Sequence, residues 1–256
     1  MMYLCSMETF NIILPTSWAE MDDKQLLMVY NLFARDLSAT EVKTLCLMKW
    51  NDLKVLATLP SHRYLIKRKH EPGIVLNCQQ VLQATTALDF LDSLAPMPVR
   101  IAKIGKHHAL PADFEKVSFE QFLYVENLFQ GYLNTQADDL LLQMAQVLYA
   151  SDHVKPSKGH LVGIFYWMAS LKQFFAGLFP NFYKPASPSS DTNLLGSSSD
   201  IYSQLRESTN AMIRALTGGD ITKEEQILKM DTWRALTELD AKAKEADDLR
   251  KATKKP

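Results

Sequence analysis

Residues 184–200 read KPASPSSDTNLLGSSSD, a Pro- and Ser-rich stretch that contains one short apolar dipeptide. Such a composition cannot bury enough apolar surface to offset the entropy lost on ordering, so it predicts a flexible linker. The chain before it is long, apolar and aromatic, and the chain after it is short and carries charges of both signs. We therefore expect a domain over residues 1–183, the linker over 184–200 and a helical module over 201–256.

The composition is that of a globular protein and gives no global attraction to nucleic acid or membrane. Of the 256 residues, 47% are hydrophobic, and 28 basic residues balance 29 acidic ones to a net charge of −1. Binding to a polyanion therefore requires a local patch. Cys5, Cys46 and Cys78 are few and far apart, which favours reduced thiols in a cytoplasm over a disulfide framework. The first residues lack a basic segment followed by a long apolar run, so a secretory signal is not expected.

The region before the linker is expected to be mostly helical with a small β element near 63–104. Apolar residues at helical spacing predict a helix over about 18–35 and another from Ser38 or Thr40. Short strands are expected at 63–69 and 74–77 around a His-Glu-Pro-Gly turn, with a third at 99–104. From Ser118 the pattern is helical. The fold class is α+β, dominated by helices.

The module after the linker is expected to hold two helices, 201–216 and 223–251, joined by a turn that contains Gly218 and Gly219. The second helix carries large apolar side chains on one side. These side chains are Met230, Trp233, Leu236 and Leu239. The stripe has two interpretations: it packs against the neighbouring helix 201–216, or it docks a partner protein.

The aromatic stretch 164–183 lies in an expected helix over about 160–179. Lys172 and Gln173 interrupt it in mid-span, so we expect no transmembrane segment. A core helix is the favoured interpretation, and an interfacial membrane helix is the alternative.

Two of the expected strands are basic, which supports an alternative function in nucleic-acid binding. The residues concerned are Arg63, Tyr64, Lys67, Arg68, Lys69, Arg100 and Lys103. Cations beside an aromatic ring are a known means of gripping single-stranded nucleic acid. The competing interpretation is that Lys and Arg on edge strands prevent aggregation.

Motifs for catalysis, cofactors and metals are absent from the sequence. There is no P-loop, no G-x-G-x-x-G, no G-x-S-x-G, no H-E-x-x-H and no cysteine pair at zinc spacing. We therefore expect no enzyme activity, no catalytic residues, no cofactor and no metal site.

Two stretches resemble proteins of one kind. Residues 164–183 (IFYWMASLKQFFAGLFPNFY) and the segment 210–251 resemble uncharacterised proteins encoded in prophages and mobile elements of anaerobic gut bacteria. The second segment is also similar to the small helical modules of phage tail-assembly accessory proteins, in which a short helix, a Gly-containing turn and a Trp-bearing helix recur. The resemblance implies a non-enzymatic structural or assembly protein that contacts other proteins, including phage structural proteins. It supplies no catalytic residues.

Overall fold

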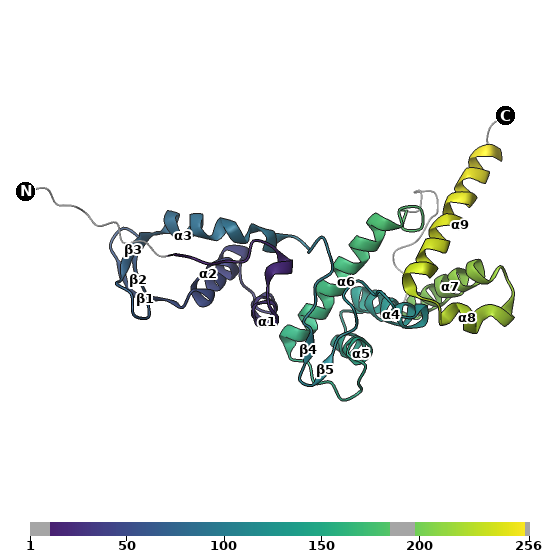
Figure 1. The fold of residues 1–256 in the computed structure, drawn as a ribbon, viewed down its shortest axis with the longest axis horizontal. Helices are drawn as coiled ribbons and strands as arrows, with labels where there is room; N and C mark the ends of the chain where they lie inside the picture. Colours follow the sequence, from purple (N-terminus) through teal and green to yellow (C-terminus); the bar gives the residue numbers. More distant parts are fainter. Residues whose placement is uncertain (1–10, 185–197, 254–256) are drawn as a thin grey trace, which may run out of the picture. The chain divides into compact units, whose positions relative to one another are not determined.

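The computed structural model describes residues 11–184 and 198–253, and it has the helix-dominated α+β fold that the sequence predicts (Figure 1). The chain divides into two compact units, residues 1–95 and 96–256. The boundary falls between Ala95 and Pro96, in an Ala-Pro-Met-Pro segment where proline prevents a helix from continuing.

This division corrects the predicted domain boundary at 184–200. The helices that follow residue 200 share one core with the helices that precede residue 183, so 201–256 is not a separate module. At the ends of the predicted linker, Lys184 forms an ion pair with Asp247 at 2.5 Å, and residues 198–200 belong to a helix. Residues 185–197, on which the rest of the linker prediction falls, lie outside the described residues.

The first unit begins with two helices that start at capping boxes. Helix α1 (Asp23–Phe33) is capped by Asp22, and α2 (Ala39–Trp50) is capped by Ser38. In each box the cap side chain accepts a hydrogen bond from the third helical amide, and the third side chain accepts one from the cap amide. The helix predicted over about 18–35 therefore starts later than expected, and its first residues form only the short 3₁₀ helix η1 (Trp18–Glu20), without a side-chain cap bond.

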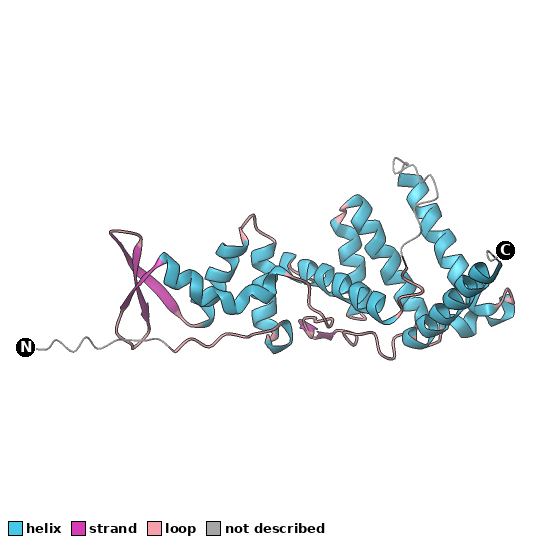
Figure 2. Ribbon diagram, turned by 90° about the horizontal axis from the view of Figure 1, so that it is seen from above, coloured by secondary structure: helices cyan, strands magenta, loops and turns pink. Residues whose placement is uncertain are grey.

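A three-stranded antiparallel sheet follows in the order β1 (Leu53–Leu59), β2 (Arg63–Arg68), β3 (Ile74–Asn77) (Figure 2). The predicted third strand at 99–104 is wrong. Only Lys103–Ile104 (β4) pairs there, with His107–His108 (β5), in a separate two-stranded ladder of the second unit. The chain leaves β3 directly into α3 (Cys78–Thr85), which continues as the 3₁₀ helix η2 (Thr86–Asp92).

The core of the first unit lies where α1, α2 and η2 meet. The ring of Trp18 stacks on Tyr30 at 6.1 Å, and its Nε1 donates to the Phe90 carbonyl at 3.0 Å. Lys43 of α2 is 8% exposed, and its Nζ donates to Asp89 Oδ1 at 2.7 Å and Asp92 Oδ2 at 2.5 Å. These bonds tie η2 to α2.

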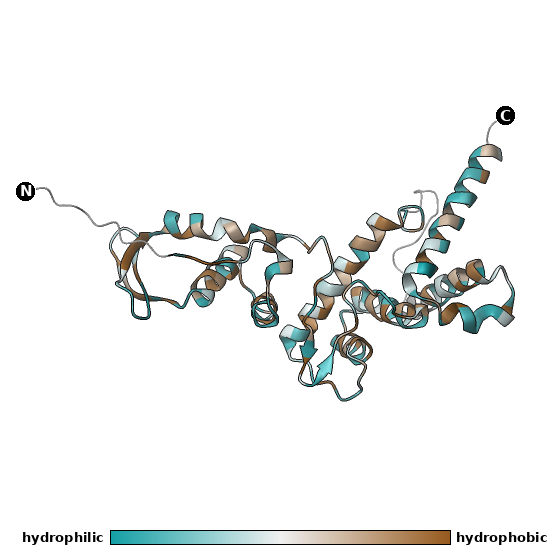
Figure 3. Ribbon diagram, viewed as in Figure 1, coloured by the Kyte–Doolittle hydropathy of each residue, from teal (hydrophilic) through white to brown (hydrophobic). Residues whose placement is uncertain are grey.

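The second unit is an assembly of helices around an aromatic core. Its elements are α4 (Phe119–Thr135), α5 (Asp138–Leu148), α6 (Lys158–Leu178), α7 (Ser198–Thr217), η3 (Ile221–Lys223), α8 (Glu224–Leu228) and α9 (Thr232–Thr253). Phe119, Trp167, Phe175 and Leu236 are at most 1% exposed in this core. Helix α6 is apolar along most of its length, whereas α9 becomes hydrophilic beyond its first turns (Figure 3).

Among the described residues, α6 is the one helix with the length and apolar composition to cross a membrane. Its side chains Ile164, Trp167, Leu171 and Phe175 are buried in the core of the second unit. This burial favours the core-helix interpretation of the aromatic stretch. The expectation that the chain has no transmembrane segment stays a prediction.

A short backbone clamp joins the start of α4 to the start of α9. The Phe119 amide donates to the Met230 carbonyl at 2.8 Å, and the Thr232 amide donates to the Val117 carbonyl at 2.9 Å. The predicted turn before it is confirmed: Gly218 and Gly219 adopt positive φ values of 65° and 87°, and the Gly219 amide donates to the Arg214 carbonyl at the end of α7. This six-to-one bond is the Schellman helix ending that glycine favours.

Candidate partner-binding site

The apolar stripe Met230, Trp233, Leu236 and Leu239 is part of the protein's own core. Leu236 is fully buried and Leu239 is 4% exposed. Trp233 Nε1 donates to the Asp113 carbonyl at 2.8 Å, and its ring lies 5.8 Å from Phe174 and 5.9 Å from Phe175. The interpretation of this stripe as a partner-docking surface is therefore wrong. Aromatic side chains of α6 pack against Trp233, and Met212, Ile213 and Leu216 of the neighbouring helix 201–216 pack on the same core, as the first interpretation expects.

The predicted basic set is divided between the two units. Arg100 and Lys103 belong to the second unit, and the other five residues belong to the first. Within β2, side chains alternate between the two faces of the sheet, so Tyr64 and Lys67 lie on opposite faces. Arg68 donates to the carbonyls of Asn51 and Asn11, both at 2.9 Å, and pairs with Glu71. Arg100 Nε donates to the Leu110 carbonyl.

Basic side chains that remain on the outer face of the sheet are Arg63, Lys67, Lys69 and one residue that the sequence analysis missed, Lys54. Lys54 lies directly opposite Lys67 in the β1–β2 ladder. Together with Asp52, Leu56 and Arg68, these lysines line a hollow of about 320 Å³. Like charges directly opposite each other destabilise a sheet, so this face gains stability when an anion approaches. Lys54 was missed because the strand that carries it was not recognised.

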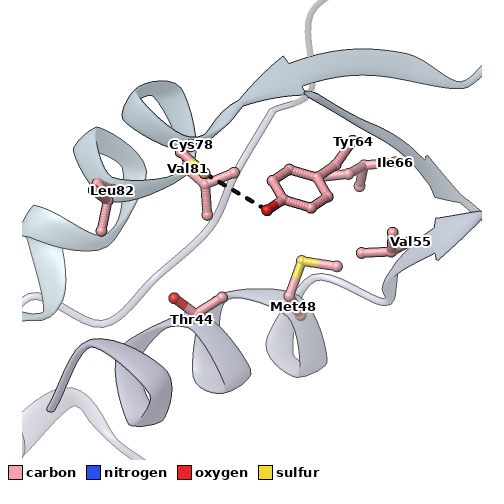
Figure 4. Close-up of a pocket in the computed structure, with 8 residues that line it drawn as sticks. All are labelled: Thr44, Met48, Val55, Tyr64, Ile66, Cys78, Val81 and Leu82. Atoms are coloured by element: carbon pink, nitrogen blue, oxygen red, sulfur yellow. Dashed lines mark hydrogen bonds between the residues drawn. The ribbon is translucent and has the colours of Figure 1, made fainter. Parts of the chain in front are cut away.

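An apolar pocket of about 280 Å³ lies on the other face of the same sheet; we call it the inner pocket (Figure 4). Its walls come from α2, the sheet and α3. The lining residues are Thr44, Met48, Val55, Tyr64, Ile66, Cys78, Val81 and Leu82.

The local sequence explains why these side chains converge. Asn77 ends β3 and caps α3, because its side chain accepts the Gln80 amide at 2.8 Å. The chain therefore turns from strand to helix without a loop, and Cys78 becomes the first helical residue. Residues 78, 81 and 82 then share one face of α3 toward the sheet. Met48 lies one turn after Thr44 on α2, on the opposite wall (Figure 4).

Polar groups in the inner pocket are few, and two of them lie within contact distance of each other. The Tyr64 hydroxyl lies 3.6 Å from the Cys78 sulfur (Figure 4). The hydrogen bond to Cys78, with the charge that thiol carries when ionised, raises the pKa of Tyr64. The phenol is therefore neutral at physiological pH. The lining brings one thiol, one phenol and one threonine hydroxyl, and no carboxylate, imidazole or ammonium group.

The pocket is open at its rim, where large apolar side chains meet solvent. Val55 is 51% exposed and Leu82 is 47% exposed. Single exposed apolar residues are ordinary, but several that adjoin an apolar pocket mark a binding site. The inner pocket is suited to an apolar group and offers no acid–base pair for chemistry.

Within the described ranges, no group of three His, Cys, Asp or Glu side chains is placed to hold a metal ion. Comparisons with known proteins found no matching family model, no matching curated protein and no matching solved structure.

Proposed function

We propose that this protein is a non-enzymatic assembly protein that acts through protein–protein contacts, with the inner pocket of the first unit as the site that holds a partner. The observation that carries the proposal is the open apolar pocket whose rim residues Val55 and Leu82 are about half exposed. Burial of such a rim under a partner removes apolar surface from water, which is the main driving force of association.

The setting that we propose is a phage or prophage, with phage structural proteins as partners in the bacterial cytoplasm. Support for this setting comes from the resemblance of residues 164–183 and 210–251 to proteins of such elements. The second unit then serves as the rigid part of the molecule, because its apolar stripes are buried in one core.

The expected partner inserts one large apolar side chain between α2 and α3. A pocket with this lining recognises an aliphatic or aromatic anchor, and such anchors supply most of the free energy at protein interfaces. The thiol and phenol of the Cys78–Tyr64 pair lie in the pocket and give a polar contact for the partner's backbone. Specificity then comes from the shape of the pocket and from these two groups.

The experiment is co-expression of the full chain with each structural protein encoded beside it, followed by co-purification and titration of the pair. Leu82→Glu places a charge at the rim of the inner pocket and is expected to weaken binding at least about tenfold, because the carboxylate must be desolvated. The matched control is Leu142→Glu, at a 39% exposed position on α5, which is expected to bind normally. Equal loss in both variants, or no binding by the unaltered chain, contradicts the proposal.

A second candidate function is nucleic-acid binding by the outer face of the sheet, favoured by the opposed pair Lys54 and Lys67. Affinity for single-stranded DNA should then fall steeply with salt, because each phosphate contact releases a counterion. Lys54→Ala with Lys67→Ala should weaken binding and flatten the salt dependence. Lys155→Ala with Lys158→Ala, in the second unit, is the control. No binding by the unaltered chain at low salt removes this candidate.

A further inference from the structure

A groove of about 640 Å³ lies between α1 and α2 and shares no lining residue with the inner pocket. Its floor is aliphatic and consists of Leu27, Met28, Leu32 and Leu45. Leu32 is 6% exposed, whereas Leu45 is 36% exposed. The floor is therefore anchored in the core but remains open to solvent.

Three cations stand around this aliphatic floor. They are Lys24 of α1, Arg35 just after α1 and Lys49 of α2. All three are exposed, and no ion pair joins any of them to a carboxylate within the part of the chain that the structure describes. The groove is thus apolar at its base and positively charged at its rim.

Two acidic residues at the starts of these helices act as caps. Asp22 accepts the Gln25 amide at 2.8 Å at the start of α1. Glu41 accepts the Ser38 amide at 2.8 Å and the Ser38 hydroxyl at 2.7 Å at the start of α2. These carboxylates cap helices, where the helix dipole favours them. The residues that line the groove include these three cations and no carboxylate.

We propose that the groove between α1 and α2 binds an amphipathic helix of a partner protein, whose aliphatic stripe is flanked on both sides by Asp and Glu. The aliphatic stripe covers the floor, and the flanking carboxylates meet Lys24, Arg35 and Lys49. This is the helix-in-groove mode of recognition. Met28 suits it, because a flexible thioether side chain adapts to the side chains that it meets.

The charge and shape of the groove favour an acidic helix over a nucleic acid or a lipid bilayer. A nucleic acid binds where phosphates meet cations and bases stack on rings, but the lining of the groove holds no aromatic side chain. A lipid bilayer is bound by apolar side chains that protrude from a helix into it, whereas these side chains line a hollow. A helix with acidic flanks satisfies both the floor and the rim.

The surface is distinct from the inner pocket, although α2 contributes to both. Leu45 and Lys49 point into the groove, and Thr44 and Met48 line the inner pocket. The groove is therefore a second partner-binding surface beyond the proposed function, and it can be tested independently of the inner pocket.

The test is a selection of helical peptides on the full chain. The display library holds peptides of about 20 residues, long enough to form a helix, with a fixed leucine stripe and flanking positions randomised between Glu, Lys, Gln and Ser. The unaltered protein is expected to enrich Glu at the flanks. The variant Lys24→Glu/Lys49→Glu is expected to enrich Lys instead, and to bind the selected acidic peptide on the order of tenfold more weakly.

The matched control is Lys155→Glu/Lys158→Glu, which makes the same change of charge at exposed positions of the second unit. It is expected to enrich Glu like the unaltered protein and to bind the acidic peptide equally well. Equal loss in both variants, enrichment that ignores charge, or no enrichment at all overturns the proposal. Binding to phosphatidylserine vesicles or to single-stranded DNA that is lost in Lys24→Glu/Lys49→Glu, without peptide enrichment, also overturns it. Variant folding is checked by circular dichroism.

Discussion

The carboxylate of Asp240, on α9, holds the backbone and the side chain of Asn181 at the same time. Oδ1 accepts the Asn181 amide at 2.8 Å, and Oδ2 accepts Asn181 Nδ2 at 2.8 Å. Oδ1 also accepts the Phe182 amide at 3.0 Å. One side chain therefore caps the turn that follows α6 and fixes that turn to α9.

Asp240→Ala is expected to destabilise the second unit by about 2 kcal/mol, because two amides and a side-chain donor lose a charged acceptor. Burial alone raises the pKa of Asp240, but the hydrogen bonds from Asn181 and Phe182, with the charge of Lys244, outweigh it and lower the pKa below 3.8. The stabilisation is therefore present above the unfolded pKa and is lost as the pH falls through the lower folded value. Urea unfolding at pH 7 and near pH 3 measures both effects. A pH-independent difference between variant and wild type contradicts the assignment.

Trp233→Ala is expected to cost about 3–5 kcal/mol in stability, because it removes a large side chain from the aromatic core and leaves the Asp113 carbonyl without its donor. Leu249→Ala, at a 69% exposed position on the same helix, is the control and is expected to change stability by about 0.5 kcal/mol at most. Denaturant unfolding followed by far-ultraviolet circular dichroism measures both. Unchanged stability of Trp233→Ala shows that the tryptophan is not part of the core.

The two described thiols are expected to differ in reactivity. Burial raises the pKa of the Cys46 thiol from 9.0 to about 12, whereas Cys78 is exposed. In a Cys5→Ser background, a thiol reagent at pH 8 should therefore modify Cys78 rapidly and Cys46 only after unfolding. Because the folded pKa of Cys46 is raised, its contribution to stability is complete below pH 9 and is lost as the pH rises toward 12. Mass spectrometry of the labelled peptides decides the outcome, and equal labelling of both cysteines contradicts it.

Removal of the two carboxylates that pair with Lys43, Asp89 and Asp92, is expected to cost more stability than removal of Lys43 itself. Asp89→Asn with Asp92→Asn leaves a nearly buried ammonium group without its counter-charges and should cost about 3 kcal/mol. Lys43→Met removes the charge itself, and the two partly exposed carboxylates can hydrate, so the expected cost is below about 1.5 kcal/mol. Thermal and urea unfolding compare the variants. A larger loss in Lys43→Met than in the double variant reverses the assignment.

The helices were predictable where local signals were strong. Of the two expected starts of the second helix, Ser38 and Thr40, the structure uses Ser38, which forms a capping box with Glu41. The helical pattern expected from Ser118 is α4, and Ser118 caps it. β1 was missed: its residues follow α2 after only a two-residue turn, and Leu53 fits the apolar pattern of that helix. The strand expected at 99–104 has the residue alternation of a strand, but the other two expected strands pair with each other and with β1 instead. Which strands pair over a long sequence distance cannot be read from a single segment.

The site was less predictable than the fold. The inner pocket draws its lining from residues 44 to 82 on α2, the sheet and α3, and no spacing in the sequence announces that they meet. The stripe around Trp233 was recognised correctly as one helix face, but the sequence could not show that aromatic side chains of α6 pack on Trp233. Local periodicity identifies a face, and only the tertiary arrangement identifies what packs on it.

The clamp between α4 and α9 governs when the second unit can be completed during synthesis. The Thr232 hydroxyl donates to the carbonyl of Val117, a residue 115 positions earlier. A nascent chain that has not yet passed Trp233 leaves the rings of Phe174 and Phe175 without one of their neighbours. Contacts of such high sequence separation slow folding, so the aromatic core stays incomplete and prone to aggregation until α9 emerges from the ribosome. Loss of residues 232–253 by premature termination is therefore a folding defect of the whole second unit.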